Sequence, residues 1–209
     1  ELIGYFMGDG SLHSKGLRFC VDNKDEDVIQ HLKNLVKELF NLEVNVSQRK
    51  GYKEVAVNSV PLVVWWDSCG FSKLKPSDEH RGKGYTPHIP DAILHSNNRK
   101  TYASFLRGLF EADGSVTLGV PSLTTASKQF CQEIKTLLLS LGYPTTTKID
   151  KSGWGESDLY VLRLKNISYN LLFVDNIKFI SNRKNEKISL SRSSQSGKND
   201  HIYVSDDIV

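Results

Sequence analysis

A ten-residue segment occurs twice in this chain of 209 residues, with the two copies half a chain apart. Leu2–Ser11 reads LIGYFMGDGS and Leu106–Ser115 reads LRGLFEADGS. Self-similarity over such a distance is the signature of a duplicated structural unit. The repeat therefore predicts two halves with the same order of helices and strands, and it places Asp9 and Asp113 at equivalent positions.

The sequence after each copy follows one pattern. A helical run with one apolar stripe comes first, then two segments rich in β-forming residues that are separated by a Gly-containing turn, and then a second helix. The predicted helices cover 28–40, 60–68, 130–141 and 168–176, and the predicted strands cover 43–48, 54–58, 145–149 and 159–164. Each half is therefore predicted as helix, two strands, helix, two strands, helix.

The polar stretch His95–Lys100 separates the halves. We place the N-terminal half at 1–97 and the C-terminal half at 98–188. Residues 189–209 form a polar tail rich in Ser, Lys and Asn, in which 201–209 could be a final strand.

Small residues recur four positions apart in both copies, as Gly4 with Gly8 and Gly108 with Ala112. Positions i and i+4 share one face of a helix. Small side chains there allow two helix backbones to approach closely. We therefore expect the two motif helices to pack against each other as a pseudo-twofold pair. We also expect each helix to end at its Asp-Gly glycine in the left-handed conformation.

Asp9 and Asp113 would then lie at the carboxyl ends of two neighbouring helices. The helix dipole is negative there, and the two carboxylates would repel each other. A divalent cation removes both penalties, and carboxylate and carbonyl oxygens suit a hard ion such as Mg²⁺. Acidic residues on a pseudo-dyad can hold metal for in-line displacement at phosphorus.

Other classes of protein fit the sequence poorly. The three cysteines, Cys20, Cys69 and Cys131, are widely spaced and favour neither a disulfide framework nor a zinc site. We therefore expect a reducing, cytoplasmic location. No stretch approaches 18 apolar residues, so no membrane span is expected. The start at Glu1 has no signal-peptide pattern and no Met, which favours a segment cut from a longer protein.

The two decamers resemble the paired signature helices of LAGLIDADG homing endonucleases, in the single-chain, two-motif class. The resemblance implies an α+β fold of two pseudo-symmetric αββαββα half-domains, packed through the motif helices, with antiparallel sheets forming a saddle over double-stranded DNA. It implies a monomer that makes a Mg²⁺-dependent double-strand break across the minor groove and leaves short 3′ overhangs, with Mn²⁺ or Ca²⁺ able to substitute for binding. By motif position, Asp9 and Asp113 are the catalytic metal ligands, and Gly8 and Ala112 contribute backbone carbonyls.

Two further stretches resemble the intein-borne branch of that family. Residues 88–94 are similar to its K-x-I-P block, but Pro87 stands where the lysine is expected, and the nearest basic residues are Arg81 and Lys83. Residues 181–184 resemble the region that carries the corresponding lysine of the second half, which makes Lys184 the candidate catalytic lysine. The resemblance of 201–209 to a strand that re-enters a splicing domain suggests an intein with splicing domains on both sides. A group I intron origin stays open.

Basic and polar side chains gather at corresponding places in the two halves. Strand alternation would direct His13, Lys15 and Arg18 toward one surface, where a two-stranded ribbon can read base edges. A compact chain of this length has a radius of gyration of about 17 Å. An elongated pseudo-dimer of that mass would cover about 20 base pairs at roughly 3.4 Å each. The candidate DNA-binding residues are His13, Lys15, Arg18, Gln48, Arg49, Lys50, Lys53, Arg81, Lys83, Lys148, Lys151, Trp154, Arg163 and Lys165.

Two residue clusters and the function itself have alternative interpretations. Trp65 and Trp66 are more typical of a core than of a base-stacking platform. The acidic residues 22–27 complement the start of a helix rather than bind metal. The same fold could also serve an intron RNA maturase or a non-catalytic DNA-binding regulator, but retention of both Asp9 and Asp113 favours cleavage.

Overall fold

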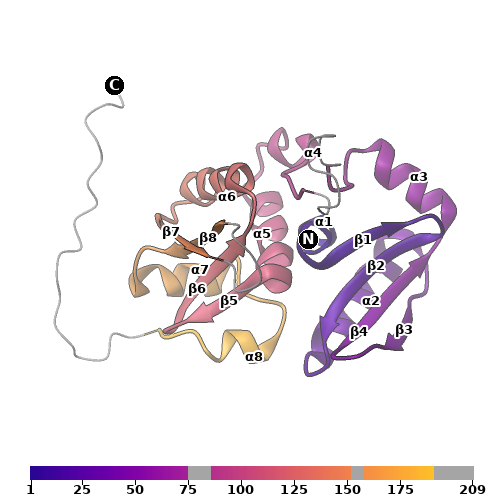
Figure 1. The fold of residues 1–209 in the computed structure, drawn as a ribbon, viewed down its shortest axis with the longest axis horizontal. Coiled ribbons are helices and arrows are strands. Elements are labelled where there is room, and N and C mark those ends of the chain that lie inside the picture. Colours follow the sequence, from indigo (N-terminus) through magenta and orange to yellow (C-terminus); the bar gives the residue numbers. More distant parts are fainter. Residues whose placement is uncertain (75–85, 152–157, 191–209) are drawn as a thin grey trace.

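A computed structural model describes residues 1–74, 86–151 and 158–190, and it shows two halves of similar construction (Figure 1). The first half contains α1 (Leu2–Asp9), β1 (Gly10–His13), β2 (Gly16–Asp22), α2 (Glu26–Phe40), β3 (Asn45–Gln48), β4 (Tyr52–Asn58) and α3 (Val60–Ser68). The second half contains α5 (Arg99–Asp113), β5 (Gly114–Thr117), β6 (Val120–Thr125), α6 (Lys128–Ser140), β7 (Thr145–Lys151), β8 (Asp158–Leu164), η2 (Ile167–Tyr169) and α7 (Asn170–Asn176). The fold has two further short helices, α4 (Asp91–Leu94) before α5 and α8 (Asn182–Asn185) after α7.

Each half forms one antiparallel four-stranded sheet, in the orders β1-β2-β4-β3 and β5-β6-β8-β7. The strand pairs within the two sheets correspond one to one. Figure 1 shows the sheets on either side of the α1 and α5 pair. The predicted α+β class with two αββαββα halves is confirmed.

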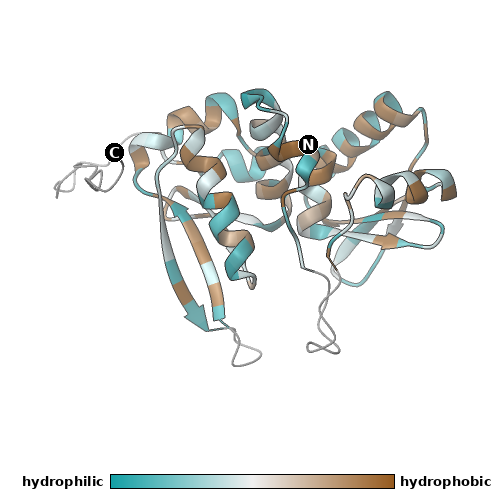
Figure 2. Cartoon of the chain, turned by 90° about the horizontal axis from the view of Figure 1, so that it is seen from above, coloured by the Kyte–Doolittle hydropathy of each residue, from teal (hydrophilic) through white to brown (hydrophobic). Residues whose placement is uncertain are grey.

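Each half has its own hydrophobic core. The first lies between its sheet and helices α2 and α3 around Phe19, Val55 and Trp66, and the second is built around Phe110 and Phe173. The helices in Figure 2 carry both teal and brown residues, as expected where one face is buried and the other meets water. The cores also exchange residues, because Met7 of α1 packs into the second core and Ala112 of α5 packs against the first.

The motif helices α1 and α5 touch through their small residues, as the sequence predicts. A Cβ atom on Gly4 would lie 1.9 Å from the carbonyl oxygen of Phe105, and one on Gly108 would lie 2.1 Å from that of Glu1. A Cβ on Gly8 would lie 2.4 Å from the Cβ of Ala112. These distances are shorter than van der Waals contact, so the approach of the two backbones requires glycine.

The prediction of left-handed glycines at the ends of these helices is wrong. Gly10 has φ −95° and ψ 156°, and Gly114 has φ −87° and ψ 157°, so both are extended and begin a strand directly. Each chain segment turns back closely on its own helix. A Cβ on Gly10 would lie 2.5 Å from Phe6 Cα, and one on Gly114 would lie 2.3 Å from the Phe110 oxygen. Glycine is therefore needed for space rather than for a positive φ.

The element bounds differ modestly from those predicted. The helix expected at 60–68 is found with those bounds as α3, whereas the one expected at 168–176 divides into η2 and α7. The proposed final strand at 201–209 lies outside the described residues, and the boundary at 97/98 stays a prediction. Within the described part of the chain, no helix is long and apolar enough to cross a membrane.

Candidate functional site

Asp9 and Asp113 are the last residues of α1 and α5, and they meet where these helices lie side by side. The carboxyl carbon of Asp113 lies 3.2 Å from the position that a Cβ on Gly8 would take. Asp9 is exposed and Asp113 is partly buried. The structure thus brings the two predicted acids together at the junction of the halves.

The surroundings of the two carboxylates disfavour their charge. Although Asp9 is exposed as a residue, the atoms packed around its carboxyl reduce the solvation of that group and raise its pKa, and Lys73 and Lys184 oppose the effect. Loss of solvation and the neighbouring Asp9 raise the pKa of Asp113 to about 6, against the same two lysines. Loss of solvation is the larger cause at both carboxyls, and the repulsion that the sequence indicated adds to it at Asp113.

Two lysines approach this junction, one from each half. Lys73 donates a hydrogen bond to the Gly8 carbonyl oxygen at 2.5 Å. Lys184 donates to the Glu111 carbonyl oxygen, lies 3.4 Å from the carboxylate of Glu111 and has a side chain only 14% exposed. Burial lowers the pKa of Lys73, while Asp113 and Asp9 raise it. The prediction that Lys184 lies at the site is consistent with this geometry.

Lys73 is the residue that sequence analysis missed. Lys73 lies two residues after Phe71, whose ring centroid is 5.4 Å from that of Trp66 in α3. The segment of Lys184 begins in the same way at Phe179, whose ring centroid is 5.5 Å from that of Phe173 in α7. The phenylalanine after each third helix is therefore the signal that could have found this lysine. The comparison with the K-x-I-P block directed attention to Pro87 instead.

The sheet faces turned away from the cores carry polar side chains, and we call them the open faces. Strand alternation buries Leu17 and Phe19 and directs Arg18 outward, opposite Ser11 on β1. In the second sheet Ser122 and Arg163 are paired in register on the open face. Because β1 and β5 begin directly after the aspartates, both open faces start at the carboxylate pair.

The candidate DNA-binding residues divide into four groups. The strand register places four of them on the open faces: His13, Arg18, Lys148 and Arg163. Arg49 is exposed, and its 2.8 Å ion pair with Glu54 brings it to the open face of the first sheet. Exposed residues at strand ends or turns are Lys15, Gln48, Lys50, Lys151 and Lys165. Lys53 lies on the helix-facing side of its sheet and pairs with Glu26 of α2. Arg81, Lys83 and Trp154 lie outside the described residues.

The chemistry of the junction fits a hard divalent cation. The two carboxylates supply oxygen donors, and the Gly8 carbonyl, which accepts a hydrogen bond from Lys73, would add one where Lys73 releases it. A positive ion would also remove the repulsion by Asp9 that adds to loss of solvation in raising the pKa of Asp113. No group of three acidic, His or Cys side chains that could hold a metal occurs in the described residues. An ion held by two carboxylates and carbonyls must keep several waters or take substrate oxygens, as Mg²⁺ commonly does.

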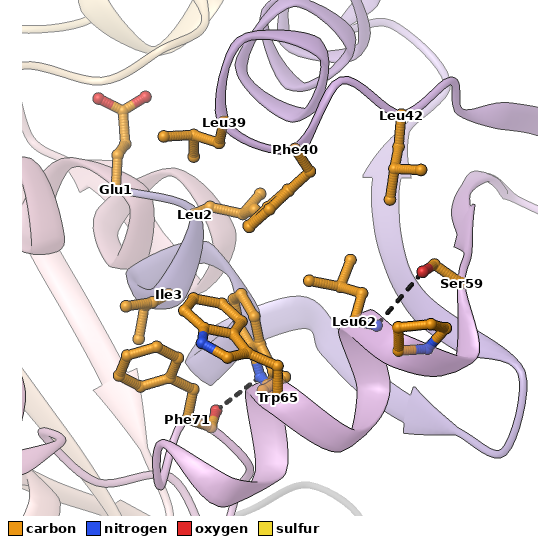
Figure 3. A pocket seen from close by; sticks show the side chains of 12 residues that line it. Glu1, Leu2, Ile3, Leu39, Phe40, Leu42, Ser59, Leu62, Trp65 and Phe71 are labelled. Carbon is orange, nitrogen blue, oxygen red and sulfur yellow. Dashed lines mark hydrogen bonds between the residues drawn. The ribbon is translucent and has the colours of Figure 1, made fainter.

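The tryptophan pair is core only in part. Trp66 is 1% exposed, but Trp65 is 47% exposed. Consecutive residues of a helix point about 100° apart, so α3 can bury only one of them. Trp65 lines an apolar pocket of about 710 Å³ with Phe40, Leu62 and Phe71 (Figure 3). Neither aspartate is among the residues that line it.

A family model matches most of the second half. Residues 100–178 match the model described as LAGLIDADG-like domain. This range begins in α5 and ends after α7.

The whole fold is similar to solved structures. A crystal structure of the homing endonuclease I-DmoI in complex with DNA and Mn has a TM-score of 0.59 and 20% identity, over 84% of this chain and 93% of that chain. The N-terminal LAGLIDADG domain of DUF199/WhiA has a TM-score of 0.55 and 17% identity, over 84% of this chain and 79% of the other.

Curated relatives match the chain over a short part of their own length. Glutamine–fructose-6-phosphate aminotransferase of Methanocaldococcus jannaschii is 29% identical over 95% of this chain and 18% of that protein. Replication factor C small subunit of the same organism is 27% identical over 90% of this chain and 10% of that protein. The chain thus spans less than a fifth of these relatives. Residues 100–178 match a LAGLIDADG-like domain, and the chain as a whole has the single-chain, two-motif LAGLIDADG fold of the I-DmoI structures.

Proposed function

We propose that this protein is a site-specific homing endonuclease, which makes a Mg²⁺-dependent double-strand break in a DNA target of about 20 base pairs and leaves short 3′ overhangs. The observation that carries the proposal is the junction itself. Asp9 and Asp113 meet at the ends of paired helices, and Lys73 and Lys184 approach them from opposite halves. One acid and one lysine from each half give a site for each strand.

The chain's own residues would have distinct tasks. Asp9, Asp113 and the carbonyls of Gly8 and Ala112 would hold Mg²⁺, with Mn²⁺ or Ca²⁺ able to replace it for binding. The ion, when bound, supplies Lewis-acid activation of water and stabilises charge on the scissile phosphate. Lys73 and Lys184 would orient water or neutralise charge on the phosphate, as preorganised cations do at developing anions.

The two open faces would contact the DNA. The residues on or reaching them include Arg18, Arg49 and Arg163, whose guanidinium groups can bind phosphates or guanine edges. Polar Ser and Thr side chains of β5 and β6 add hydrogen-bonding groups. The remaining candidates would extend the contact toward strand ends and turns.

Crystal structures of I-DmoI support the choice of partner and ion. They are described as complexes with target DNA in the presence of Mn, Mg or Ca. The TM-score of 0.59 supports a shared fold, and because the identity is only 20%, the transfer of activity rests on the acids and lysines of this chain.

We further propose an intein origin. The relatives include an aminotransferase, a replication factor subunit, an ATP synthase subunit and a DNA polymerase. Enzymes with such different activities do not need a common segment of this fold. An inserted element with splicing domains on both sides explains why it occurs within all of them.

Two other assignments follow, one from the pairing of the acids within a single chain and one from the proposed substrate. Because both come from one chain, we propose a monomer with half-domains at 1–97 and 98–188. We also propose an intracellular protein, since its substrate is DNA.

An intron RNA maturase and a non-catalytic DNA-binding regulator on the same fold are the alternative candidates. Both acids and a lysine from each half are present, which a binding protein would not need.

The test is incubation of the protein with plasmids that carry uninterrupted host-gene junctions. We expect linear product with Mg²⁺ and none with EDTA. Asp9→Asn and Asp113→Asn should each abolish double-strand cleavage. Binding without cleavage by the wild type would support the regulator, and full cleavage by both variants would refute the catalytic assignment.

A further inference from the structure

A salt bridge between the halves lies directly beside Lys184. Arg183 of α8 donates from Nε and Nη2 to the two carboxylate oxygens of Asp25, at 2.7 and 2.6 Å. Asp25 precedes α2 in the other half and is only 3% exposed. A bidentate pair of this kind fixes orientation as well as distance.

The same short segment is held from two sides. The Glu111 carboxylate accepts hydrogen bonds from the backbone N–H groups of Ile180 and Ser181, at 2.7 and 2.8 Å. From the opposite half, Asp27 accepts one from the Asn182 N–H at 2.8 Å. A helix as short as α8 cannot maintain its own geometry. The position of α8, and of Lys184 on it, therefore depends on these anchors.

The groups that hold α8 have no counterparts at the equivalent positions of the other half. In the second half, the N-cap Ser127 and Gln129 of α6 occupy the places of Asp25 and Asp27 at the start of α2, and neither carries a carboxylate. Met7 occupies the place of Glu111 in the first half. The segment of Lys73 cannot be bound by equivalent groups.

We propose that Asp25 is a positioning residue for Lys184, acting through Arg183, so that the N-terminal half controls one of the two strand cuts. The inference rests on the proposed nuclease function. Removing the Asp25 carboxylate would break the bidentate contact and leave Arg183 only its longer ion pair with Asp22 at 3.6 Å, so that α8 could move. Displacement of a catalytic group by about 1 Å can slow a reaction about a hundredfold.

The experiment measures the cleavage rate of each strand separately, with both strands labelled, under single-turnover conditions. Asp25→Asn should slow one strand at least tenfold, so that nicked DNA accumulates, and leave the other within twofold. Glu43→Gln is the matched control, because it removes a carboxylate from an exposed ion pair with Lys37 beyond the opposite end of α2. It should leave both rates unchanged.

Double variants separate positioning from general loss of structure. If Asp25 acts through Lys184, Asp25→Asn should add no further slowing to Lys184→Gln. Arg183→Lys, which keeps the charge but loses the bidentate contact, should give an intermediate rate on the same strand. Equal slowing of both strands, an additive double variant, or unchanged rates would overturn the proposal. Absence of cleavage by the wild type would instead refute the nuclease function.

Discussion

Asp113→Asn should stabilise the metal-free protein at neutral pH, although it removes a catalytic group. Burial and the neighbouring Asp9 raise the pKa of Asp113 from 3.8 to about 6. The native state therefore binds this proton more tightly than the unfolded chain does. Stability must then fall as pH rises from about 4 to about 6, and it stays at the lower value above that range.

The gain in the free energy of unfolding follows from the shift in the pKa of Asp113. About two pH units at roughly 1.4 kcal/mol each correspond to about 3 kcal/mol. Because the carboxyl is only partly buried and water screens it, we expect about 1–3 kcal/mol. Asparagine keeps the shape of the side chain and removes the charge.

Urea unfolding in EDTA measures this directly, at several pH values from 4 to 8. The variant should be more stable than the wild type by about 1–3 kcal/mol at pH 7, and the difference should approach zero near pH 4. Asp150→Asn, in the exposed pair with Lys148, is the control and should show no such pH-dependent gain. A variant less stable than the wild type at pH 7, or a gap independent of pH, would refute the argument.

Three more outcomes are expected. Gly4→Ala should lower the free energy of unfolding by about 3 kcal/mol, since its Cβ would enter the carbonyl of Phe105; an unchanged melting temperature would contradict the close approach. Trp66→Ala should cost about 3–5 kcal/mol and Trp65→Ala less than about 1, as thermal or chemical unfolding would show. Arg163→Ala should reduce the slope of log affinity against log salt by about 0.9 in a DNA-binding titration, if this residue contacts a phosphate.

The duplicated decamer made most of the fold predictable. Small residues four apart, with aspartates at matched places, indicate both the helix pair and the meeting of the acids. The conformation of Gly10 could not be predicted, because the same residue type serves a positive φ or a tight approach. Only the packing of Gly10 against Phe6 decides between them.

Parts of the site depend on packing between distant segments. Lys73 reaches Gly8 across the fold, and Glu111 and Asp25 bind the segment of Lys184 from different halves. No local pattern reports such contacts. The acidic residues at the start of α2 fit the expected helix dipole, but their bonds to Arg183 could be found only in the structure.

The direct passage from each motif helix into a strand has a consequence for how such a protein could acquire new targets. Since no loop separates Asp9 from β1 or Asp113 from β5, the spacing between the cutting groups is set by the rigid helix pair. The stagger of the two breaks should then be inherited unchanged, while substitutions toward the far ends of the strands alter which bases are preferred.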